Sequence, residues 1–438
     1  MEEFNIGTAV LLLDDFGIES EKLWTSFQLS YRTEPVSVIE EDGFLPEAVE
    51  SVYGFFLGSF QGKENVPGRP LFFNEVKVPD FWEIKGNNSS GEIYDRNHLR
   101  GRIFYAKEKE KRQIRVVDWL DDRGIVRFCD HYNKYGAIYA RTAFNAKGQK
   151  VNKAFFDAEG KEIIVENYVT KDILLNEGNR TLVFPGKTEF VIYYLKKRGF
   201  EKSQLFYNSL STPFFVSQAL GDREKKDVLF WQEAERDDVP GNMQVILSGQ
   251  SHTGKIIVQK RKAYEKFREL QVPAEWMEYK GYLYPFQKAN THGTDILICT
   301  NSDQIANLDL LVRELPDMQF HIAAITEMSS QLMAFGSRPN VFLYPNVPMK
   351  KVKELFAKCD YYLDINYGSE ILDSVYQAFL HNQLVLGFNE TVHNREYIHP
   401  RLRFGVADGG QMVEFLRNAK KDDGELDLLL EKQRAYLS

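Results

Sequence analysis

The sequence predicts an α/β fold of two α/β domains, with an antiparallel β-meander inserted into the first. Residues 1–66 and 186–272 alternate apolar, strand-like runs with helical stretches, which is the pattern of a parallel sheet covered by helices. Residues 67–185 contain short alternating runs instead, and residues 273–438 return to the α/β pattern. A chain of 438 residues is long enough to bury a separate core in each region.

The first α/β region is predicted from apolar runs and an apolar helical stripe. The stripe consists of Leu23, Phe27, Leu29 and Tyr31, and a second helical stretch extends to Phe60. The runs predicted as strands are residues 8–13, 35–39, 190–195, 228–231, 245–247 and 256–258. Strands of this kind, joined by helices, are expected to form one parallel sheet.

The inserted region is predicted as an antiparallel meander because its short strands are evenly spaced and joined by tight turns. Turn sequences occur at residues 122–124, 146–148 and 158–160, each ending in glycine. The predicted strands are residues 91–95, 101–106, 112–119, 125–130, 137–144, 151–156, 162–168 and 181–184.

The last region is predicted as a second α/β domain, entered through a linker at residues 273–284. Its final helix is predicted either to stay in this domain or to return to the N-terminal domain. Two consecutive α/β domains predict a ligand cleft between them, because open α/β sheets bind ligands at the carboxyl ends of their strands. The predicted strands are residues 295–300, 320–324, 341–344, 361–365 and 384–388.

Composition excludes several classes of function. The net charge of −8 and pI near 5.7 give no general attraction for nucleic acid or anionic lipid. Cys129, Cys299 and Cys359 are too few and scattered for a disulfide framework or a metal site, so ordinary packing is expected. Residues 249–255 have the spacing of a phosphate loop, but Ile256 replaces the hydroxyl residue that magnesium requires. We therefore expect no metal and no cofactor.

The N-terminal sequence lacks the basic flank and apolar region of a signal peptide, and no apolar run approaches the roughly 20 residues of a transmembrane helix. The sequence therefore predicts a cytoplasmic protein.

Residues 299–311 and 367–378 resemble the nucleotide-sugar site of retaining glycosyltransferases with the GT-B fold, a pair of Rossmann-like domains. In that family an Arg and a Lys after the first strand of the C-terminal domain bind the diphosphate of the donor. When the segment is aligned on residues 309–311, these positions are Asn301 and Ala306. Both cations are missing.

The second segment shows a similar loss. The family has two glutamates there, one beside the donor sugar and one on the ribose. Alignment on the residues that follow places Ser369 and Gln377 at these positions, whereas a shift of one residue offers Glu370 but pairs it with Ala378.

The missing cations bear directly on catalysis. A departing nucleotide diphosphate gains negative charge, and fixed cations or helix N-termini stabilise it in enzymes without a metal. Loss of one such group typically costs about 2.7–4 kcal/mol of barrier. The resemblance therefore implies a pseudo-glycosyltransferase with no catalytic residues.

A narrower resemblance covers essentially the whole chain. The chain is similar to the non-catalytic stabilising subunit, or glycosylation chaperone, of the accessory Sec-system O-GlcNAc transferase that modifies serine-rich repeat adhesins. The segments that carry it are residues 43–46, 67–76, 79–84, 101–105, 117–119, 231–234 and 240–243. The resemblance implies a catalytic transferase as partner, cytoplasmic glycosylation of the adhesin before export, and a place at the inner face of the membrane through the partner.

These expectations assign two candidate sites. An acceptor-binding cleft, left by the degenerate donor site, is expected to hold the Ser/Thr-rich adhesin through many weak polar contacts. Its predicted residues are Asn301, Ser302, Asp303, Tyr367, Ser369, Glu370, Gln377 and Glu233. The predicted partner interface lies on the meander at Trp82, Phe104, Tyr105 and Trp119.

The predicted site residues also have purely structural explanations. Tyr367 and Gln377 also fit helix capping and packing, the acidic loop at Glu233 fits a solvated turn, and half of the aromatic residues fit the core of the meander itself. Two other functions remain: an active glycosyltransferase in which Glu370, Glu233 or Arg313 takes a substitute role, and a free-standing sugar-binding or teichoic-acid-related transferase.

Overall fold

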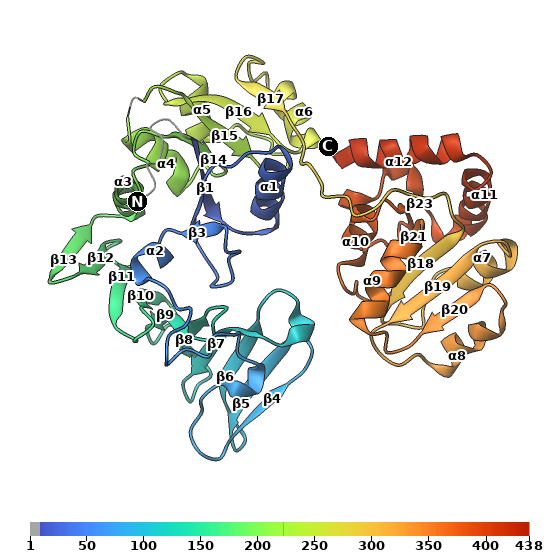
Figure 1. The fold of residues 1–438 in the computed structure, drawn as a ribbon, viewed down its shortest axis with the longest axis horizontal. Helices are drawn as coiled ribbons and strands as arrows, with labels where there is room; N and C mark the ends of the chain where they lie inside the picture. The colour runs from blue at the N-terminus through green and yellow to red at the C-terminus, as the bar shows by residue number, and fades with distance from the viewer. Residues whose placement is uncertain (1–8, 222, 438) are drawn as a thin grey trace. The chain divides into compact units, whose positions relative to one another are not determined.

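A computed structural model describes residues 9–221 and 223–437 of the chain. The chain divides into two compact units, Met1–Lys280 and Gly281–Ser438 (Figure 1). The first contains a parallel sheet and a large antiparallel sheet, and the second contains another parallel sheet. The predicted fold class is confirmed.

The first parallel sheet has the strand order β17-β16-β15-β14-β1-β2-β3. Its strands are β1 Ala9–Asp15, β2 Val36–Glu40, β3 Val49–Ser51, β14 Gln204–Tyr207, β15 Asp227–Trp231, β16 Thr253–Val258 and β17 Met277–Tyr279. The helices of this unit are α1 Ile18–Leu29, α2 Gly54–Leu57, α3 Lys187–Lys197, α4 Thr212–Ala219, α5 Gly241–Leu247 and α6 Arg261–Glu269. The order reverses between β1 and β14, which is the switch point of a doubly wound sheet.

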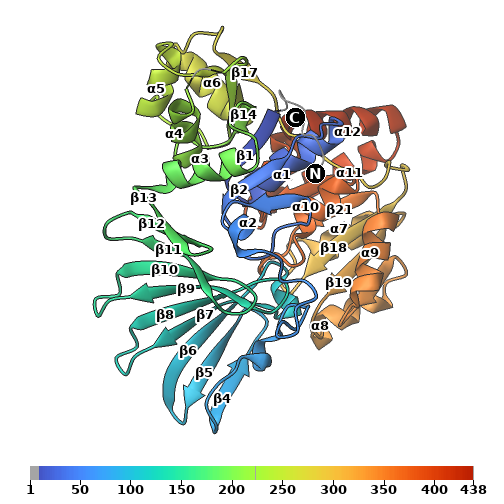
Figure 2. The same cartoon turned by 60° about the vertical axis from the view of Figure 1, so that its left-hand side comes forward.

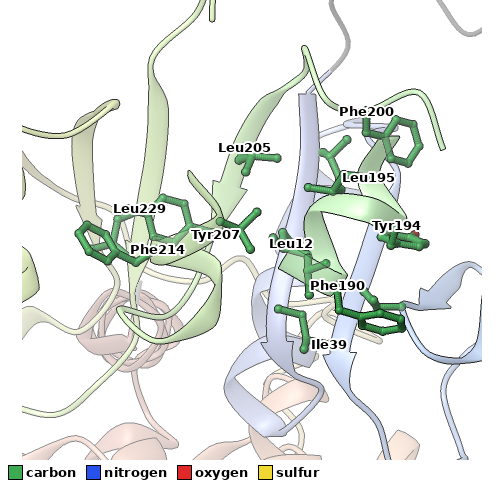
Figure 3. Close-up of a cluster of buried hydrophobic side chains, with 14 of the residues drawn as sticks. Leu12, Ile39, Phe190, Tyr194, Leu195, Phe200, Leu205, Tyr207, Phe214 and Leu229 are labelled. Atoms are coloured by element: carbon green, nitrogen blue, oxygen red, sulfur yellow. The ribbon is translucent and has the colours of Figure 1, made fainter. Parts of the chain in front are cut away.

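Two runs predicted as strands are helical, so that prediction was wrong. Residues 190–195 lie in α3 and residues 245–247 end α5. In α3 the buried side chains include Phe190, Tyr194 and Leu195, whose spacing of four and five residues places them on one helical face. Figure 3 shows these three side chains projecting from α3 into the cluster beside the first sheet.

Strands β3, β14 and β17 of this sheet are missing from the prediction, and of these β14 pairs with β1 in parallel. The predicted stripe on α1 also needs correction, because the helix ends at Leu29 and Tyr31 is almost fully exposed with a positive φ of 55°. The phosphate-loop-like segment leads into strand β16 rather than a helix, which agrees with its rejection. Cys129, Cys299 and Cys359 are buried and free, as expected.

The inserted region forms one antiparallel sheet whose strands follow each other in sequence from β4 to β13 (Figure 2). The strands are β4 Trp82–Gly86, β5 Ser90–Asp95, β6 His98–Tyr105, β7 Ile114–Leu120, β8 Val126–Tyr132, β9 Ile138–Phe144, β10 Lys150–Phe156, β11 Glu162–Asn167, β12 Ile173–Glu177 and β13 Arg180–Phe184. Strands β4 and β12 lie outside the predicted runs. Gly124, Gly148 and Gly160 adopt positive φ at three of the turns, a conformation that glycine adopts without strain.

The two faces of the antiparallel sheet are covered at opposite ends. Tyr53 stacks on Phe155 with 4.6 Å between ring centroids and also contacts Phe190 of α3, so the β9–β12 end shares a core with the first sheet. The β5–β8 end packs its other face, which includes Ile103 and Val117, against Val76 of the segment before β4. Each end of the sheet therefore leaves one face open.

The parallel sheet of the second unit has the order β20-β19-β18-β21-β22-β23. Its strands are β18 Asp295–Thr300, β19 Gln319–Ala324, β20 Val341–Tyr344, β21 Tyr361–Asp364, β22 Leu384–Phe388 and β23 Arg403–Phe404. The helices of this unit are α7 Leu308–Glu314, α8 Ser330–Met333, α9 Met349–Lys358, α10 Ser374–Leu380, α11 Gly409–Ala419 and α12 Asp423–Leu437. The order reverses between β18 and β21, which makes this pair the switch point.

Both ends of the second unit are held by buried hydrogen bonds. The entering segment is fixed at Asp360, whose carboxylate accepts from Lys288 Nζ at 2.6 Å and from Thr291 Oγ1 at 2.6 Å. The final helix α12 is fixed by Gln433, which accepts from the Val385 amide at 2.9 Å and donates to the Gln383 carbonyl at 2.9 Å.

Candidate functional site

Six of the eight predicted cleft residues lie in the two loops at the switch point of the second unit. Asn301, Ser302 and Asp303 follow β18, whereas Tyr367, Ser369 and Glu370 follow β21 and Gln377 lies in α10. The carboxyl ends of these adjacent strands bring the two loops together, which is the usual ligand position of such a sheet.

The two loops are joined to each other by backbone hydrogen bonds. The Ala306 amide donates to the Ile365 carbonyl at 2.8 Å, and the Tyr367 amide donates to the Gln304 carbonyl at 3.0 Å. Ala306 is only 4% exposed. The position that carries a phosphate-binding Lys in GT-B enzymes is therefore a buried methyl group at this junction.

Asn366 provides a second connection between the loops. Its side-chain amide lies 3.4 Å from Asn301 Oδ1 and 3.4 Å from the Ser369 carbonyl, while its Oδ1 accepts from the Gly368 amide at 3.0 Å. Gly368 packs so closely that an added Cβ would lie 1.9 Å from Asn301 Oδ1. A larger residue at 368 would therefore force the Asn301 side chain to move, and protein atoms occupy the space between the loops.

A cavity of about 300 Å³ opens at the carboxyl ends of β18 and β19. Its polar lining includes Asn301, Ser302, Thr326 and Ser329, together with the carboxylates of Asp303 and Glu327. None of the residues that line this cavity is Lys or Arg. A diphosphate placed here would face two carboxylates without a compensating cation, so the cavity favours neutral hydroxyl, amide or backbone groups.

His393 connects the end of β21 to the second loop. Its Nδ1 lies 2.6 Å from Asp364 Oδ1 and its Nε2 lies 2.6 Å from the Gly368 carbonyl oxygen. The hydrogen bond to buried Asp364 raises the pKa of His393 to about 9, so the imidazole is protonated at neutral pH and donates both bonds. This cation is ion-paired within the fold and stabilises the loop instead of facing the cavity.

Glu370 and Gln377 support helix α10. Glu370 Oε1 accepts from the Val375 amide at 2.9 Å, which satisfies one donor of the first helical turn, and burial raises the pKa of this carboxyl group. The carbonyl of Gln377 accepts from the His381 backbone amide. The Gln377 contact is an ordinary backbone hydrogen bond at the end of α10 and involves no atom of its side chain, while Tyr367 is 50% exposed.

Glu233 lies in the first unit, in the loop after β15. It is exposed and pairs with Arg236 at 3.2 Å, and Arg236 also contacts Asp238 at 3.3 Å. The acidic loop is thus a solvated turn with its own counterion, and the structure does not group Glu233 with the other seven residues within one unit.

The four aromatic residues predicted as a partner surface do not share one face of the meander. Phe104 pairs with Val116 and Ile103 pairs with Val117, so Phe104 points to the opposite face from the core around Ile103. Trp82, Tyr105 and Trp119 belong to or pack on that core. Tyr105 is only 4% exposed and its hydroxyl donates to the Ser90 carbonyl at 2.9 Å, so its ring is part of the sheet interior.

Sequence reasoning missed Asn366, Gly368 and His393 as site residues. Asn366 directly follows a predicted strand, a position from which a carboxamide often bonds its own loop. His393 carried no local signal, because its partner Asp364 lies 29 residues earlier in the chain.

Metal ligation and membrane insertion find no support in the described part of the chain. Residues 9–221 and 223–437 contain no cluster of His, Cys, Asp and Glu placed to hold a metal ion. Within the same residues, every helix is too short or too polar to span a bilayer.

Four domain families match the chain in sequence. They are described as GtfB N-terminal domain (residues 10–56), GtfB middle domain (82–185), GtfB third domain (187–270) and GftB/GlyA-F C-terminal domain (296–433). A relative from Streptococcus agalactiae is 42% identical, and the match covers 98% of this chain and 96% of that protein. The chain belongs to the GtfB family.

Other GtfB relatives extend beyond streptococci. A protein from Limosilactobacillus reuteri is 35% identical over 98% of this chain and 96% of its own length. Both relatives are named stabilizing proteins, called GtfB, of the UDP-N-acetylglucosamine-peptide N-acetylglucosaminyltransferase.

Solved structures agree with this family. A crystal structure of a GtfA/B complex bound to UDP and GlcNAc contains a chain that is 37% identical, with a TM-score of 0.91 and coverage of 98% of this chain and 96% of that one. A Streptococcus pneumoniae structure of accessory secretory proteins 1, 2 and 3 shares the fold at a TM-score of 0.60 and 10% identity.

Proposed function

We propose that this GtfB-family chain is a non-catalytic pseudo-glycosyltransferase subunit that stabilises a peptide O-GlcNAc transferase. The observation that carries the proposal is the junction of the two switch-point loops, where Ala306 is buried and Asn301 packs against Gly368. A Lys at residue 306 would have to bury its amine at that junction, and the adjoining cavity offers carboxylates instead of cations. The names of the GtfB relatives support the stabilising role.

The absence of both cations favours loss of catalysis over weakened catalysis. Each missing charged group of this kind removes about 2.7–4 kcal/mol of transition-state stabilisation. Two such losses would reduce the rate by several orders of magnitude. Glu370 cannot replace the cations, because a carboxylate has the wrong sign for a departing diphosphate.

We further propose that the seven cleft residues of the second unit hold the Ser/Thr-rich adhesin acceptor before accessory Sec export. Hydroxyl and carboxamide groups at Asn301, Ser302 and Ser369 suit an extended backbone with small hydroxyl side chains. The exposed ring of Tyr367 offers a flat contact beside them. In this proposal the protein acts in the cytoplasm and reaches the inner face of the membrane through its partner.

The partner is proposed to dock on the meander, at surfaces that include Trp82, Phe104 and Trp119. An open sheet face beside a core is a common association surface. Tyr105 is left out of this proposal because it is buried.

Transfer assays test the proposed function directly. A Ser-rich repeat peptide is incubated with UDP-GlcNAc and with this chain alone, the cognate transferase alone, or both. We expect negligible transfer by this chain alone and a large gain from the mixture. Transfer by this chain alone would instead support the active-enzyme alternative, and an unchanged rate in the mixture would refute the stabilising role.

A further inference from the structure

A group of cations lies around His399 at the β23 edge of the second sheet. His399 precedes the short 3₁₀-helix Pro400–Leu402, which leads directly into β23 at Arg403, and Lys432 lies in α12. These elements all belong to the second unit (Figure 1). We define the basic cluster as His399, Arg401, Arg403 and Lys432. It is built from other segments than the two switch-point loops.

Two contacts fix the His399 ring. Its Nδ1 accepts from the Arg401 backbone amide at 3.2 Å, and the ring meets Tyr436 of α12 edge-on, with 5.3 Å between ring centroids. Because Nδ1 is an acceptor, the proton of the neutral imidazole is on Nε2. Nε2 forms no hydrogen bond with any residue that the structure describes, so the ring presents an oriented N–H donor.

The charged groups that act on this ring are cations. Burial lowers the pKa of His399, and the neighbouring Arg401, Lys432 and Arg403 lower it further. The imidazole is therefore neutral at pH 7, and the cluster carries the three positive charges of these side chains. Lys432 lies one helical turn before Tyr436, so the two side chains emerge on the same side of α12.

None of the three cations is neutralised within the described part of the fold. In residues 9–221 and 223–437, the side chains of Arg401, Arg403 and Lys432 form no ion pair and no hydrogen bond. Elsewhere in the same unit a cation has its own carboxylate, as Arg338 has Asp309 at 3.1 Å. Like charges that gather without a counterion repel each other, and a bound anion removes that repulsion.

The number and kind of donors favour a phosphate monoester as the anion. A guanidinium presents several N–H donors in one plane and suits two oxygens of a phosphate, while an ammonium adds a point charge. A phosphate monoester carries about −1.5 to −2 charge near pH 7, whereas a phosphate diester or a carboxylate carries a single charge. Three cations without counterions therefore match a monoester better than either.

We propose that His399, Arg401, Arg403 and Lys432 form a binding site for the phosphate group of a phosphate monoester. The two guanidinium groups would hold the phosphate oxygens, Lys432 would add its charge from α12, and His399 Nε2 would donate to one oxygen. This site goes beyond the proposed stabilising function and does not depend on it.

Calorimetric titration of the full chain with methyl phosphate tests the site, with dimethyl phosphate, a diester, as the matched ligand. We expect saturable binding of methyl phosphate and at least about tenfold weaker binding of dimethyl phosphate. Arg401→Gln and Lys432→Gln should each weaken the binding of methyl phosphate about fivefold or more. Both side chains are exposed, and circular dichroism verifies that each variant is folded.

The matched control variants remove cations of the same unit outside the cluster. Lys350 and Lys353 of α9 are exposed and form no ion pair with any described residue. Lys350→Gln and Lys353→Gln should each change the binding of methyl phosphate less than about twofold, because a solvated surface charge contributes little at this distance. An equal loss in these controls would show a general charge effect and overturn the site.

The imidazole provides a readout that a purely structural role would not change. A phosphate dianion beside Nε2 stabilises the protonated ring, so saturating methyl phosphate should raise the pKa of His399 in an NMR titration. His399→Gln identifies the resonance. An unchanged pKa at saturation would place the ligand elsewhere and overturn the assignment.

Vesicle flotation separates two sources of the same group, because a phosphate monoester occurs in soluble compounds and in the headgroup of phosphatidic acid. Vesicles of phosphatidylcholine alone are compared with vesicles that also contain phosphatidic acid. Binding of methyl phosphate without flotation assigns a soluble ligand, whereas flotation that Arg401→Gln and Lys432→Gln abolish assigns the headgroup. Equal binding of methyl and dimethyl phosphate, binding that survives both substitutions, or no binding of either probe would overturn the proposal.

Discussion

At the carboxyl edge of the first parallel sheet, the residues that directly follow three neighbouring strands are all carboxamides. Asn208 follows β14, Gln232 follows β15 and Gln259 follows β16. Asn208 donates to Gln232 Oε1 at 2.9 Å, and Gln232 donates to Gln259 Oε1 at 3.1 Å. This edge is closed by neutral side chains that bond each other.

The corresponding edge of the second unit is closed differently. There the backbone of the two loops provides the contacts, and the ion pair of Asp364 with His393 holds the loop that contains Gly368. The two sheets share a switch-point topology, yet one edge depends on amides that do not titrate and the other on a cation with a pKa near 9. A ligand position in this fold can therefore become part of the protein interior by more than one route.

The largest expected effect comes from breaking the ion pair. Asp364→Ala leaves a protonated imidazole without its carboxylate in a buried site, which should lower the free energy of unfolding by about 3–5 kcal/mol. All five tryptophans lie in the first unit, so tryptophan fluorescence reports that unit alone. Urea unfolding followed by far-ultraviolet circular dichroism should show a destabilised transition, with the fluorescence transition unchanged.

The matched control for this variant is Asp317→Ala, which removes a carboxylate that is 82% exposed and lies 3.5 Å from Lys420. It should cost less than about 1 kcal/mol. If the two variants unfold alike, the buried pair does not stabilise the second unit.

The stability of the two units should also depend differently on pH. Because the pKa of His393 is raised from 6.5 to about 9 in the folded state, its stabilisation is complete below pH 6.5 and is lost as the pH rises to about 9. The loss should be at most about 3 kcal/mol and confined to the second unit. His393→Gln should flatten the profile, whereas His98→Gln, at an exposed position, should leave it intact.

Substitution in the amide chain should have a smaller effect. Gln232→Leu removes a donor to Gln259 and to the Glu19 carbonyl, which should cost about 1–3 kcal/mol and shift the tryptophan-fluorescence transition at any pH between 6 and 9. Gln61→Leu, at an exposed position, is the control. A pH-dependent loss in the Gln232 variant would contradict the assignment of this edge as non-titrating.

The sequence predicted most of the second unit because its strands are continuous apolar runs, and three of them, β18, β20 and β22, match the predicted bounds. In the first unit, α3 was mistaken for a strand because its buried face contains adjacent apolar residues. Strand β14 was missed because its four residues are bounded by polar ones. The short period of a strand and the buried face of a helix cannot be separated in runs of this length.

The part of the candidate site that depends on local residue types could be predicted from the sequence, and the part that depends on contacts between distant segments could not. The missing cations at residues 301 and 306 were visible in the sequence, and the grouping of Asn301 with the second loop followed from the resemblance to the GT-B donor site. The pairing of Asp364 with His393 and the separation of Phe104 from Trp119 depend on register between distant segments. The spacing of residues along the sequence does not reveal this register.

The smallest expected effect on stability is that of restoring a cation at the exposed residue 301. Asn301→Arg places a cation on an exposed side chain and should change stability by less than about 1 kcal/mol. Ala306→Lys introduces an amine at a buried junction and should be the less stable of the two. Neither variant, nor the pair together, should transfer GlcNAc from UDP-GlcNAc in a single-chain assay, and measurable turnover would show that charge alone was lacking.

Calorimetric titration of UDP-GlcNAc into the purified chain is the most direct test of the central claim that the switch point of the second unit no longer accepts a nucleotide sugar. The transferase, titrated under the same conditions, serves as the positive control. We expect no saturable heat and no release of UDP from this chain. Saturable binding that is abolished by Gly368→Val and accompanied by UDP release would contradict the account.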